Sequence, residues 1–349
     1  MKQQIKELSE LIDGAKKILI TSHISPDPDA ISSVLLLGRT LHANFPNKSI
    51  KMVLEEKPDR DLDFLKGYDE IDFLNLAQAT QEFQPGLFII VDANTYARIS
   101  RVDSEKLRSL ITSNAVKTIV IDHHEEAGKD RSDIFINNKK PATTEEIYEL
   151  FFTRLNLKKP TDFAETTLLG IISDTQRHRF DHPGYRETFR IISELLDEGA
   201  SIEKLESRLE QYNKNELDVF SHLATNIKDS GKGYTYSFIS DEFTKNWRAT
   251  NKPYADLKNG CELFSNQFIR NFENNDWGFI VYPEIMSGPD YYGVSFRSLS
   301  GIKDVSVIAR SLGGGGHKPA AGAKIEAKNI EEAIQKVQHA ITSVYGLLK

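Results

Sequence analysis

Cysteine is almost absent from this sequence, since Cys261 is the only one among 349 residues. A lone thiol excludes an intrachain disulfide, and with it the small secreted domains that disulfides hold together. Long apolar runs are also missing, because the longest, such as Leu87–Val91, have the length of a strand and not of a membrane span. The polar segment Met1–Glu10 lacks the apolar stretch of a secretory signal. We therefore expect a cytoplasmic protein without a membrane partner.

The chain also has fewer basic than acidic residues. The chain has 44 Lys and Arg residues against 51 Asp and Glu residues, which gives a formal net charge of −7. A protein that wraps a long nucleic acid usually presents a basic face. The acidic balance therefore favours a small substrate over a long nucleic acid, and a carboxylate-rich metal site would contribute to it.

The first half of the chain alternates short apolar runs with stretches of helical spacing. The runs are Lys17–Ser22, Ser49–Leu54, Leu87–Val91 and Thr118–Ile121. Short, continuous apolar runs are typical of strands that are buried on both faces of a parallel sheet. Helices between such strands predict right-handed βαβ crossovers. We expect residues 1–185 to form an α/β domain with a doubly wound, mostly parallel sheet.

The pattern changes after residue 185. Residues 186–230 have mainly helical spacing with a break near Gly199, and we expect them to connect two domains. Further on, Gly233–Ser240, Trp277–Pro283 and Tyr292–Ser298 alternate as half-exposed strands do. We expect residues 231–349 to form a second, smaller α+β domain.

Carboxylates and imidazoles follow the ends of the predicted strands in the first domain. They are His23, Asp27 and Asp29 after the first strand, Asp92 after the third, Asp122, His123 and His124 after the fourth, and Asp174 at the end of a helical segment. Ligands of open α/β sheets bind outside the carboxyl ends of the strands, so we expect these side chains to meet. A single Asp there has an ordinary explanation as a helix N-cap. Three ionisable residues directly after a buried strand are costly unless they bind something. Mixed imidazole and carboxylate ligands suit Mn²⁺, Zn²⁺ or Fe²⁺.

The second domain contains a run of four glycines, Gly313–Gly316, followed by His317 and Lys318. Backbone N–H groups of successive glycines can approach an anion closely. A flexible loop explains the glycine run equally well. Arg297, near the end of a predicted strand, offers a bidentate grip on phosphate, although a solvated surface arginine is just as common.

Together these motifs resemble the DHH phosphoesterase superfamily, in the subgroup with a DHHA1-type C-terminal domain. The triplet that names the family stands here as Asp122-His123-His124, and the first motif as His23-Ile-Ser-Pro-Asp27-Pro-Asp29. Asp92 and Asp174 match the second and fourth motifs, and Phe296-Arg297-Ser298 with Gly313–Gly322 resembles the C-terminal pattern. Size and domain content are similar to the bacterial oligoribonucleases that also hydrolyse 3′-phosphoadenosine 5′-phosphate.

The resemblance implies two divalent metal ions, with Mn²⁺ as the expected ion. One would be held by His23, Asp27 and Asp92, and the other by Asp29, Asp92, His123 and Asp174, so that Asp92 bridges them. His124 would contact the substrate phosphate, and Asp122 would orient its neighbours. The residues expected to bind the rest of the substrate are Arg297, Ser298, Gly313, Gly314, Gly315, Gly316 and His317.

The implied reaction is hydrolysis of short oligoribonucleotides or dinucleotides to mononucleotides, with 3′-phosphoadenosine 5′-phosphate as a further substrate. A cyclic-dinucleotide phosphodiesterase, a RecJ-like exonuclease on single-stranded DNA and a nucleotide-binding module without activity remain alternatives. Pro28, Ser32 and Gln176 stand where the family often has glycine, which bears on the substrate and removes no expected ligand. The resemblance leaves a homodimer open.

Overall fold

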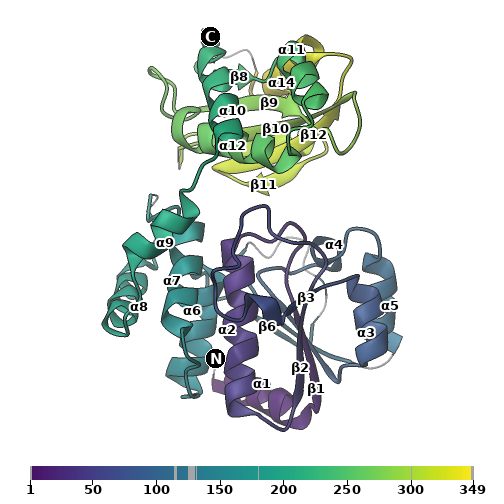
Figure 1. Cartoon of the computed structure of the whole chain (residues 1–349), viewed down its shortest axis with the longest axis vertical. Coiled ribbons are helices and arrows are strands. Elements are labelled where there is room, and N and C mark those ends of the chain that lie inside the picture. The colour runs from purple at the N-terminus through teal and green to yellow at the C-terminus, as the bar shows by residue number, and fades with distance from the viewer. Residues whose placement is uncertain are drawn as a thin grey trace. The chain divides into compact units, whose positions relative to one another are not determined.

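The chain forms two compact units, residues 1–210 and residues 211–349, each with its own hydrophobic core (Figure 1). The structure is a computed structural model, and it describes residues 2–113, 116–124, 130, 132–179, 181–299 and 301–346. Within these ranges, no helix is both long and apolar enough to span a membrane.

The first unit is built on a six-stranded sheet in which each strand runs parallel to its neighbours. Its strands are β1 (Lys17–Thr21), β2 (Ser49–Leu54), β3 (Ile71–Phe73), β4 (Leu87–Val91), β5 (Lys117–Ile121) and β6 (Ile134–Ile136). They lie in the order β3-β2-β1-β4-β5-β6. The order reverses between β1 and β4, which is the switch point of a doubly wound sheet. The predicted fold class of the first domain is confirmed.

Helices cover both faces of this sheet (Figure 1). One face carries α1 (Lys2–Gly14), α2 (Pro28–Asn44), α6 (Thr143–Ile147), α7 (Phe163–Asp174), α8 (Tyr185–Asp197) and α9 (Ile202–Leu209), and the other carries α3 (Leu76–Phe83), α4 (Tyr96–Ile99) and α5 (Ser104–Ser113). Neighbouring residues of β1 point to opposite faces, since Ile18 and Ile20 join one core and Leu19 the other. A π-helical segment, Tyr148–Arg154, follows α6.

The helices that the sequence assigns to a connector belong to the cores of the two units. Ile191, Leu195 and Leu205 of α8 and α9 pack in the first core. Val219 and Leu223 of α10 (Lys214–Thr225) pack in the second. The division between the units therefore falls after Glu210, between α9 and α10.

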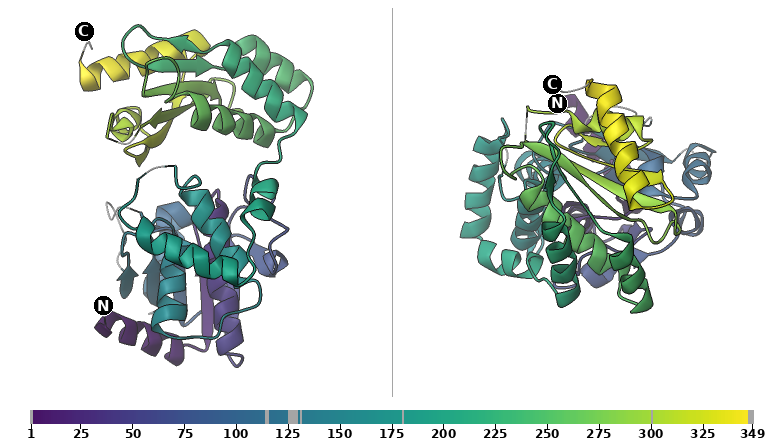
Figure 2. Two further views of the ribbon diagram at one scale, coloured as in Figure 1. Left: turned by 90° about the vertical axis from the view of Figure 1, so that its left-hand side faces the viewer. Right: turned by 90° about the horizontal axis from the view of Figure 1, so that it is seen from above.

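The second unit contains a mixed six-stranded sheet in the order β11-β12-β10-β9-β8-β7. Its strands are β7 (Lys228–Asp229), β8 (Thr235–Phe238), β9 (Trp277–Pro283), β10 (Tyr291–Ser298), β11 (Gly315–His317) and β12 (Ala320–Glu326). Helices α13 (Val305–Ser311) and α14 (Ile330–Tyr345) pack on one face, and α10, α11 (Asp241–Ala249) and α12 (Tyr254–Phe268) on the other (Figure 2, right). The predicted α+β class is confirmed.

Part of the glycine run is a strand. Gly315 and Gly316 pair with β12 through β11, so the run forms the edge of the sheet where the sequence predicts a loop. Glycine is needed at two positions for close packing on β12. A Cβ on Gly314 would lie 2.1 Å from the carbonyl oxygen of Gly322, and one on Gly316 would lie 2.6 Å from the Cα of Ala321.

Candidate metal centre

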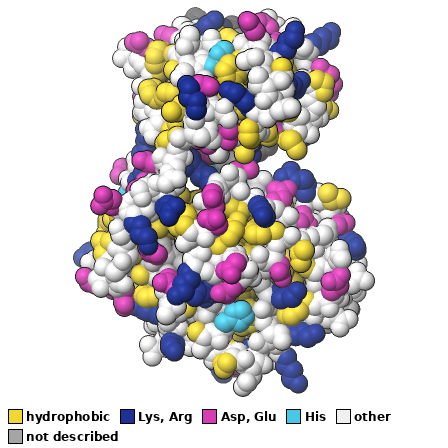
Figure 3. All heavy atoms as spheres, viewed as in Figure 1, with side chains coloured by type: hydrophobic (Ala, Val, Ile, Leu, Met, Phe, Trp, Pro, Cys, Tyr) yellow, Lys and Arg dark blue, Asp and Glu magenta, His cyan; other side chains and the backbone are white. Residues whose placement is uncertain are grey.

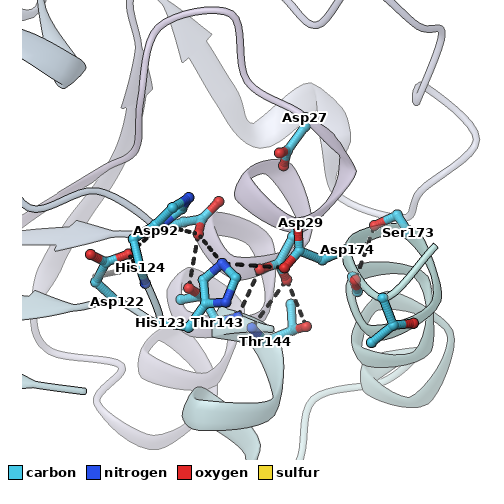
Figure 4. Close-up of polar contacts among 12 residues, drawn as sticks. Asp27, Asp29, Asp92, Asp122, His123, His124, Thr143, Thr144, Ser173 and Asp174 are labelled. Carbon is cyan, nitrogen blue, oxygen red and sulfur yellow. Dashed lines mark hydrogen bonds and ion pairs between the residues drawn. The ribbon is translucent and has the colours of Figure 1, made fainter. Parts of the chain in front are cut away.

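Three central strands of the first unit bring imidazoles and carboxylates to one end of the sheet (Figure 4). His23 follows β1, Asp92 follows β4 directly, and Asp122-His123-His124 follows β5 directly. Two helices complete the cluster, with Asp29 in the first turn of α2 and Asp174 as the last residue of α7. The cluster therefore lies at the switch point between β1 and β4, where doubly wound sheets bind their ligands.

Asp92 occupies the middle of this cluster. Its Oδ2 lies 3.3 Å from Nε2 of His23, and its Oδ1 lies 3.4 Å from Nε2 of His123. The backbone of Asp92 is left-handed, with a φ of 57°, a conformation that Asp and Asn adopt more readily than other residues with a side chain. The buried carboxylate thus offers one oxygen to each of two histidines.

The first group of potential metal ligands is His23, Asp27 and Asp92, whose ligand atoms lie within 4.8 Å of one another. Nδ1 of His23 lies 2.9 Å from the carbonyl oxygen of Ile24, and because a carbonyl only accepts, Nδ1 carries the proton of the neutral ring. Nε2 is then the atom of the neutral ring that can bind a cation, and it lies 3.8 Å from Oδ2 of Asp27. Asp27 also caps α2, since its Oδ1 accepts a hydrogen bond from the N–H of Ala30. Oδ1 of Asp27 therefore caps the helix, and Oδ2 remains available as a metal ligand.

The second group is Asp29, His123 and Asp174. Nε2 of His123 lies 3.2 Å from Oδ2 of Asp174, and Figure 4 shows the imidazole between Asp92 and the other carboxylates. Nε2 of His23 and Nε2 of His123 are both buried without a hydrogen-bond partner among the described residues. Two unpartnered imidazole nitrogens that face several carboxylates form a donor set suited to divalent cations.

The first turn of α6 holds two of the central carboxylates, a role that the sequence analysis missed. The backbone N–H groups of Thr143 and Thr144 donate to Asp29 at 2.7 and 3.1 Å, and the Thr144 hydroxyl donates to it at 2.8 Å. The Thr143 hydroxyl donates to Oδ1 of Asp92 at 2.9 Å. Gly170 of α7 leaves room for this contact, because a Cβ there would lie 2.3 Å from Oγ1 of Thr144 and 2.5 Å from Oδ1 of Asp29. Two ordinary threonines at a helix start carry no sequence signal for this role.

His124 is oriented by Asp122. Nδ1 of His124 lies 2.7 Å from Oδ1 of Asp122, and the amide of Asn94 donates to Oδ2 of Asp122 at 2.8 Å. Asp122 is fully buried, so both of its oxygens are used to hold neighbours. His124, Asp92 and His123 also lie close enough to form a third potential ligand group. Since the carboxylate of Asp122 already binds Nδ1, the contacts favour the predicted role of His124 toward substrate.

The electrostatics of the cluster indicate that positive charge is needed in it. Burial, followed by the charges of Asp92 and Asp174, raises the pKa of Asp29 well above its ordinary value. Burial also raises the pKa of Asp174 to about 6. Burial alone would lower the pKa values of His23 and His123, but the facing carboxylates raise each to about 9. Protons thus take the places that divalent cations would fill, and the side chains present fit such ions.

The second unit contains the residues expected to bind the rest of the substrate. Arg297, in β10, contacts Asn266 Oδ1, Ser295 Oγ and the carbonyl oxygen of Phe296, each at 2.8–2.9 Å. Among the described residues no carboxylate forms an ion pair with it, and burial lowers its pKa. A half-buried guanidinium without an ion pair among the described residues is suited to an anionic ligand.

The contacts of Ser298 do not favour its predicted role. Its side chain is fully buried, and its hydroxyl donates to the carbonyl of Leu299 and accepts from the N–H of Lys303. It supports the turn after β10. In contrast, Gly313, Gly315, Gly316 and His317 are exposed, and a ligand could reach the free edge of β11.

Comparison with known proteins agrees with this architecture. Residues 17–171 match the DHH family, N-terminal domain, and residues 267–343 match the DHHA1 domain. The bifunctional oligoribonuclease and PAP phosphatase NrnA of Mycoplasma pneumoniae is 28% identical over 346 residues, covering 97% of this chain and 97% of that protein. The NrnA of Bacillus subtilis is 27% identical over 321 residues, covering 91% and 92%.

A solved structure shows the same fold. It is an exopolyphosphatase-related protein from Bacteroides fragilis, with a TM-score of 0.82 and 23% identity, and the match covers 100% of this chain and 98% of that one. The two family matches fall on the two units of the structure in chain order. The chain therefore contains a domain of the DHH family in its first unit and a DHHA1 domain in its second.

Proposed function

We propose that this protein is a metal-dependent phosphoesterase that hydrolyses short oligoribonucleotides to mononucleotides and also removes a phosphate from 3′-phosphoadenosine 5′-phosphate. The observation that carries the proposal is the convergence of His23, Asp92 and His123 at the switch point, with two buried Nε2 atoms facing carboxylates. The two NrnA relatives, matched over nearly their whole length, support the substrate class.

The proposed ligands divide around Asp92. His23 and Asp27 would hold one ion with its Oδ2, and the other oxygen would serve a second ion with His123, Asp29 and Asp174, which the two separate contacts of the carboxylate support. Divalent ions bound there, Mn²⁺ in this proposal, would lower the pKa of an attacking water and stabilise charge on the phosphoryl oxygens. Thr143 and Thr144 hold the carboxylates in place before the ions bind, which reduces the rearrangement that binding requires.

His124 has a separate role in the proposed reaction. The hydrogen bond to Asp122 fixes the orientation of its ring, so the ring can contact a phosphoryl oxygen on which charge develops. In the second unit, Arg297 and the backbone N–H groups at the free edge of β11 would bind a phosphate or sugar of the nucleotide.

A substrate panel in Mn²⁺ tests the function. It contains a diribonucleotide, 3′-phosphoadenosine 5′-phosphate, a cyclic dinucleotide and a single-stranded DNA of about twenty nucleotides, a length suited to a tracking groove. We expect the first two to be hydrolysed fastest. Faster turnover of the cyclic dinucleotide or of the long DNA would replace this proposal with the corresponding enzyme class, and no turnover of any substrate would indicate a binding module.

A further inference from the structure

The chain makes an unusual turn immediately after the carboxylate of Asp174. Gln176, Arg177 and His178 are three consecutive non-glycine residues with left-handed backbones, at φ values of 46°, 61° and 58°. Residues with a side chain rarely adopt this conformation, and strained backbone of this kind is concentrated at functional sites. Two hydrogen bonds stabilise the turn, from the N–H of Arg177 to the carbonyl of Ile172 and from the N–H of His178 to the hydroxyl of Thr175. The turn delivers the imidazole of His178 four residues after a potential metal ligand.

His178 joins three other rings in a cluster that we call the aromatic platform: His178, His182, Tyr185 and Phe189. The ring centroids of His178 and Phe189 lie 4.8 Å apart, and those of His178 and Tyr185 lie 5.2 Å apart. Tyr185 also contacts Phe189 and His182, at 5.8 and 5.7 Å. Tyr185 and Phe189 lie outside the hydrophobic core of the first unit, and Phe189 is 52% exposed. The platform is therefore open to a ligand on the side of Phe189.

A hydrogen bond connects α8, the helix that carries Tyr185 and Phe189, with α6, the helix whose first turn binds two carboxylates of the cluster. Thr188, next to Phe189 in α8, donates to Oε2 of Glu145 at 2.7 Å. Glu145 lies in α6 two residues after Thr143, which itself binds Asp29 and Asp92. Burial, followed by the charges of Asp174 and Asp181, raises the pKa of Tyr185.

We propose that the aromatic platform stacks against the base of the nucleotide whose phosphate lies at the metal centre, and so selects nucleotides over phosphoesters without a base. The inference rests on the proposed function and specifies how the same site recognises its substrate. Bases of any sequence stack on aromatic side chains because each has a π face.

The test compares Phe189→Ala with Leu196→Ala, a matched control that removes another exposed apolar side chain, 41% exposed, from the same helix. Each protein is assayed in Mn²⁺ on diadenylate and on the same dinucleotide backbone without bases. We expect Phe189→Ala to raise the KM for diadenylate about 10-fold, within the range for loss of one stacked base, with kcat nearly unchanged. The KM for the abasic substrate stays the same, and Leu196→Ala behaves as the wild type.

Calorimetric binding of adenosine 5′-monophosphate and of ribose 5-phosphate supplies a readout that needs no turnover. The wild type is expected to bind the nucleotide more tightly, and Phe189→Ala to lose this preference. The proposal is wrong if Phe189→Ala leaves the KM for diadenylate unchanged or raises the KM for the abasic substrate equally. It is also wrong if the wild type binds adenosine 5′-monophosphate no more tightly than ribose 5-phosphate. If the wild type does not cleave diadenylate, the proposed function fails, and the binding preference and its loss in Phe189→Ala still decide on the platform.

Discussion

At the scale of single residues, Asp92 combines a left-handed backbone conformation with a carboxylate that contacts two histidines. Its left-handed φ turns the chain directly after β4, and its two oxygens face different histidines. The Thr143 hydroxyl adds a hydrogen bond to the oxygen that faces His123. Since Asn tolerates the same backbone, the charge of Asp92 can be removed without disturbing the turn.

We expect Asp92→Asn to abolish detectable turnover and to weaken Mn²⁺ binding. Loss of a partner of a metal ligand already costs about 10–100-fold, so loss of a ligand shared by two ions should exceed 100-fold. Steady-state kinetics and titration calorimetry with Mn²⁺ measure both effects, and the melting temperature controls for folding. Near-wild-type rates in Asp92→Asn would remove this residue from the proposed centre.

We expect His124→Ala to bind Mn²⁺ as the wild type does and to lose most of the rate. Nδ1 of the ring lies 2.7 Å from Asp122 and 3.6 Å from Asp92, so its removal should affect mainly charge stabilisation on the phosphate. Loss of such a contact costs about 10²–10³-fold in kcat. If calorimetry shows that Mn²⁺ binding is lost with His124, the ring is itself a metal ligand.

The affinity for Mn²⁺ should increase with pH. In the metal-free protein the facing carboxylates raise the pKa values of His23 and His123 to about 9, so both rings hold an additional proton at neutral pH. A cation must displace these protons, and binding therefore strengthens as the pH rises toward 9. Calorimetry in two buffers with different ionisation enthalpies measures the released protons. An affinity that stays constant from pH 6 to pH 9 would contradict this assignment.

At the scale of helices, the site depends on close packing between α6 and α7. The first turn of α6 supplies the N–H groups and hydroxyls that bind Asp29, and Gly170 of α7 lies against the same carboxylate. A side chain at Gly170 would have to displace Thr144, Asp29 or the helix itself. The position of a carboxylate in the metal centre is thus set by a residue that offers no functional group.

We expect Gly170→Ala to lower Mn²⁺ affinity and activity, and to cost about 1–3 kcal/mol in the free energy of unfolding, as overpacking does. Gly38→Ala is a matched control in another helix of the same unit, since its Cβ would lie equally close, 2.3 Å, to Sδ of Met52. The flexible Met side chain can move aside, so the control should keep its metal affinity. Equal effects in both variants would show that Gly170 matters only for packing.

At the scale of the whole molecule, charge favours short substrates. On the face drawn in Figure 3, basic and acidic side chains are interspersed, and the whole chain carries a formal charge of −7. A long strand gains affinity mainly by tracking a basic groove along its phosphates. A substrate of two nucleotides depends on local contacts, such as those that Arg297 can make.

We expect diribonucleotides to be cleaved much faster than an RNA of about twenty nucleotides, a length at which a tracking groove would normally add affinity. We also expect Arg297→Ala to raise the KM for the diribonucleotide without affecting Mn²⁺ binding, because it removes binding that ground and transition states share. Competition between labelled short and long RNA in one reaction measures the preference. Equal degradation of both would favour the RecJ-like alternative.

The sequence predicted the parts of the fold that apolar patterning defines. The buried central strands β1, β4 and β5 are continuous apolar runs, and the polar residues after them fall at one sheet edge by topology. The edge strands β3 and β6 escaped prediction because each has only three residues. Thr143, Thr144 and Gly170 escaped it because their roles arise from contact between helices distant in the chain. The edge strand β11 was missed because glycine has a low strand propensity.

The residues of the cluster at the switch point come from distant positions in the sequence, which has a consequence for protein synthesis. His23 leaves the ribosome early, whereas Asp174 appears only when most of the first unit has been made. β1 also cannot pair with β4 until β2, β3 and β4 have been synthesised. A nascent or truncated chain that ends before α7 therefore lacks Asp174, one of the proposed ligands, and should not catalyse the proposed reaction. Catalytic competence is in this way coupled to completion of the first unit.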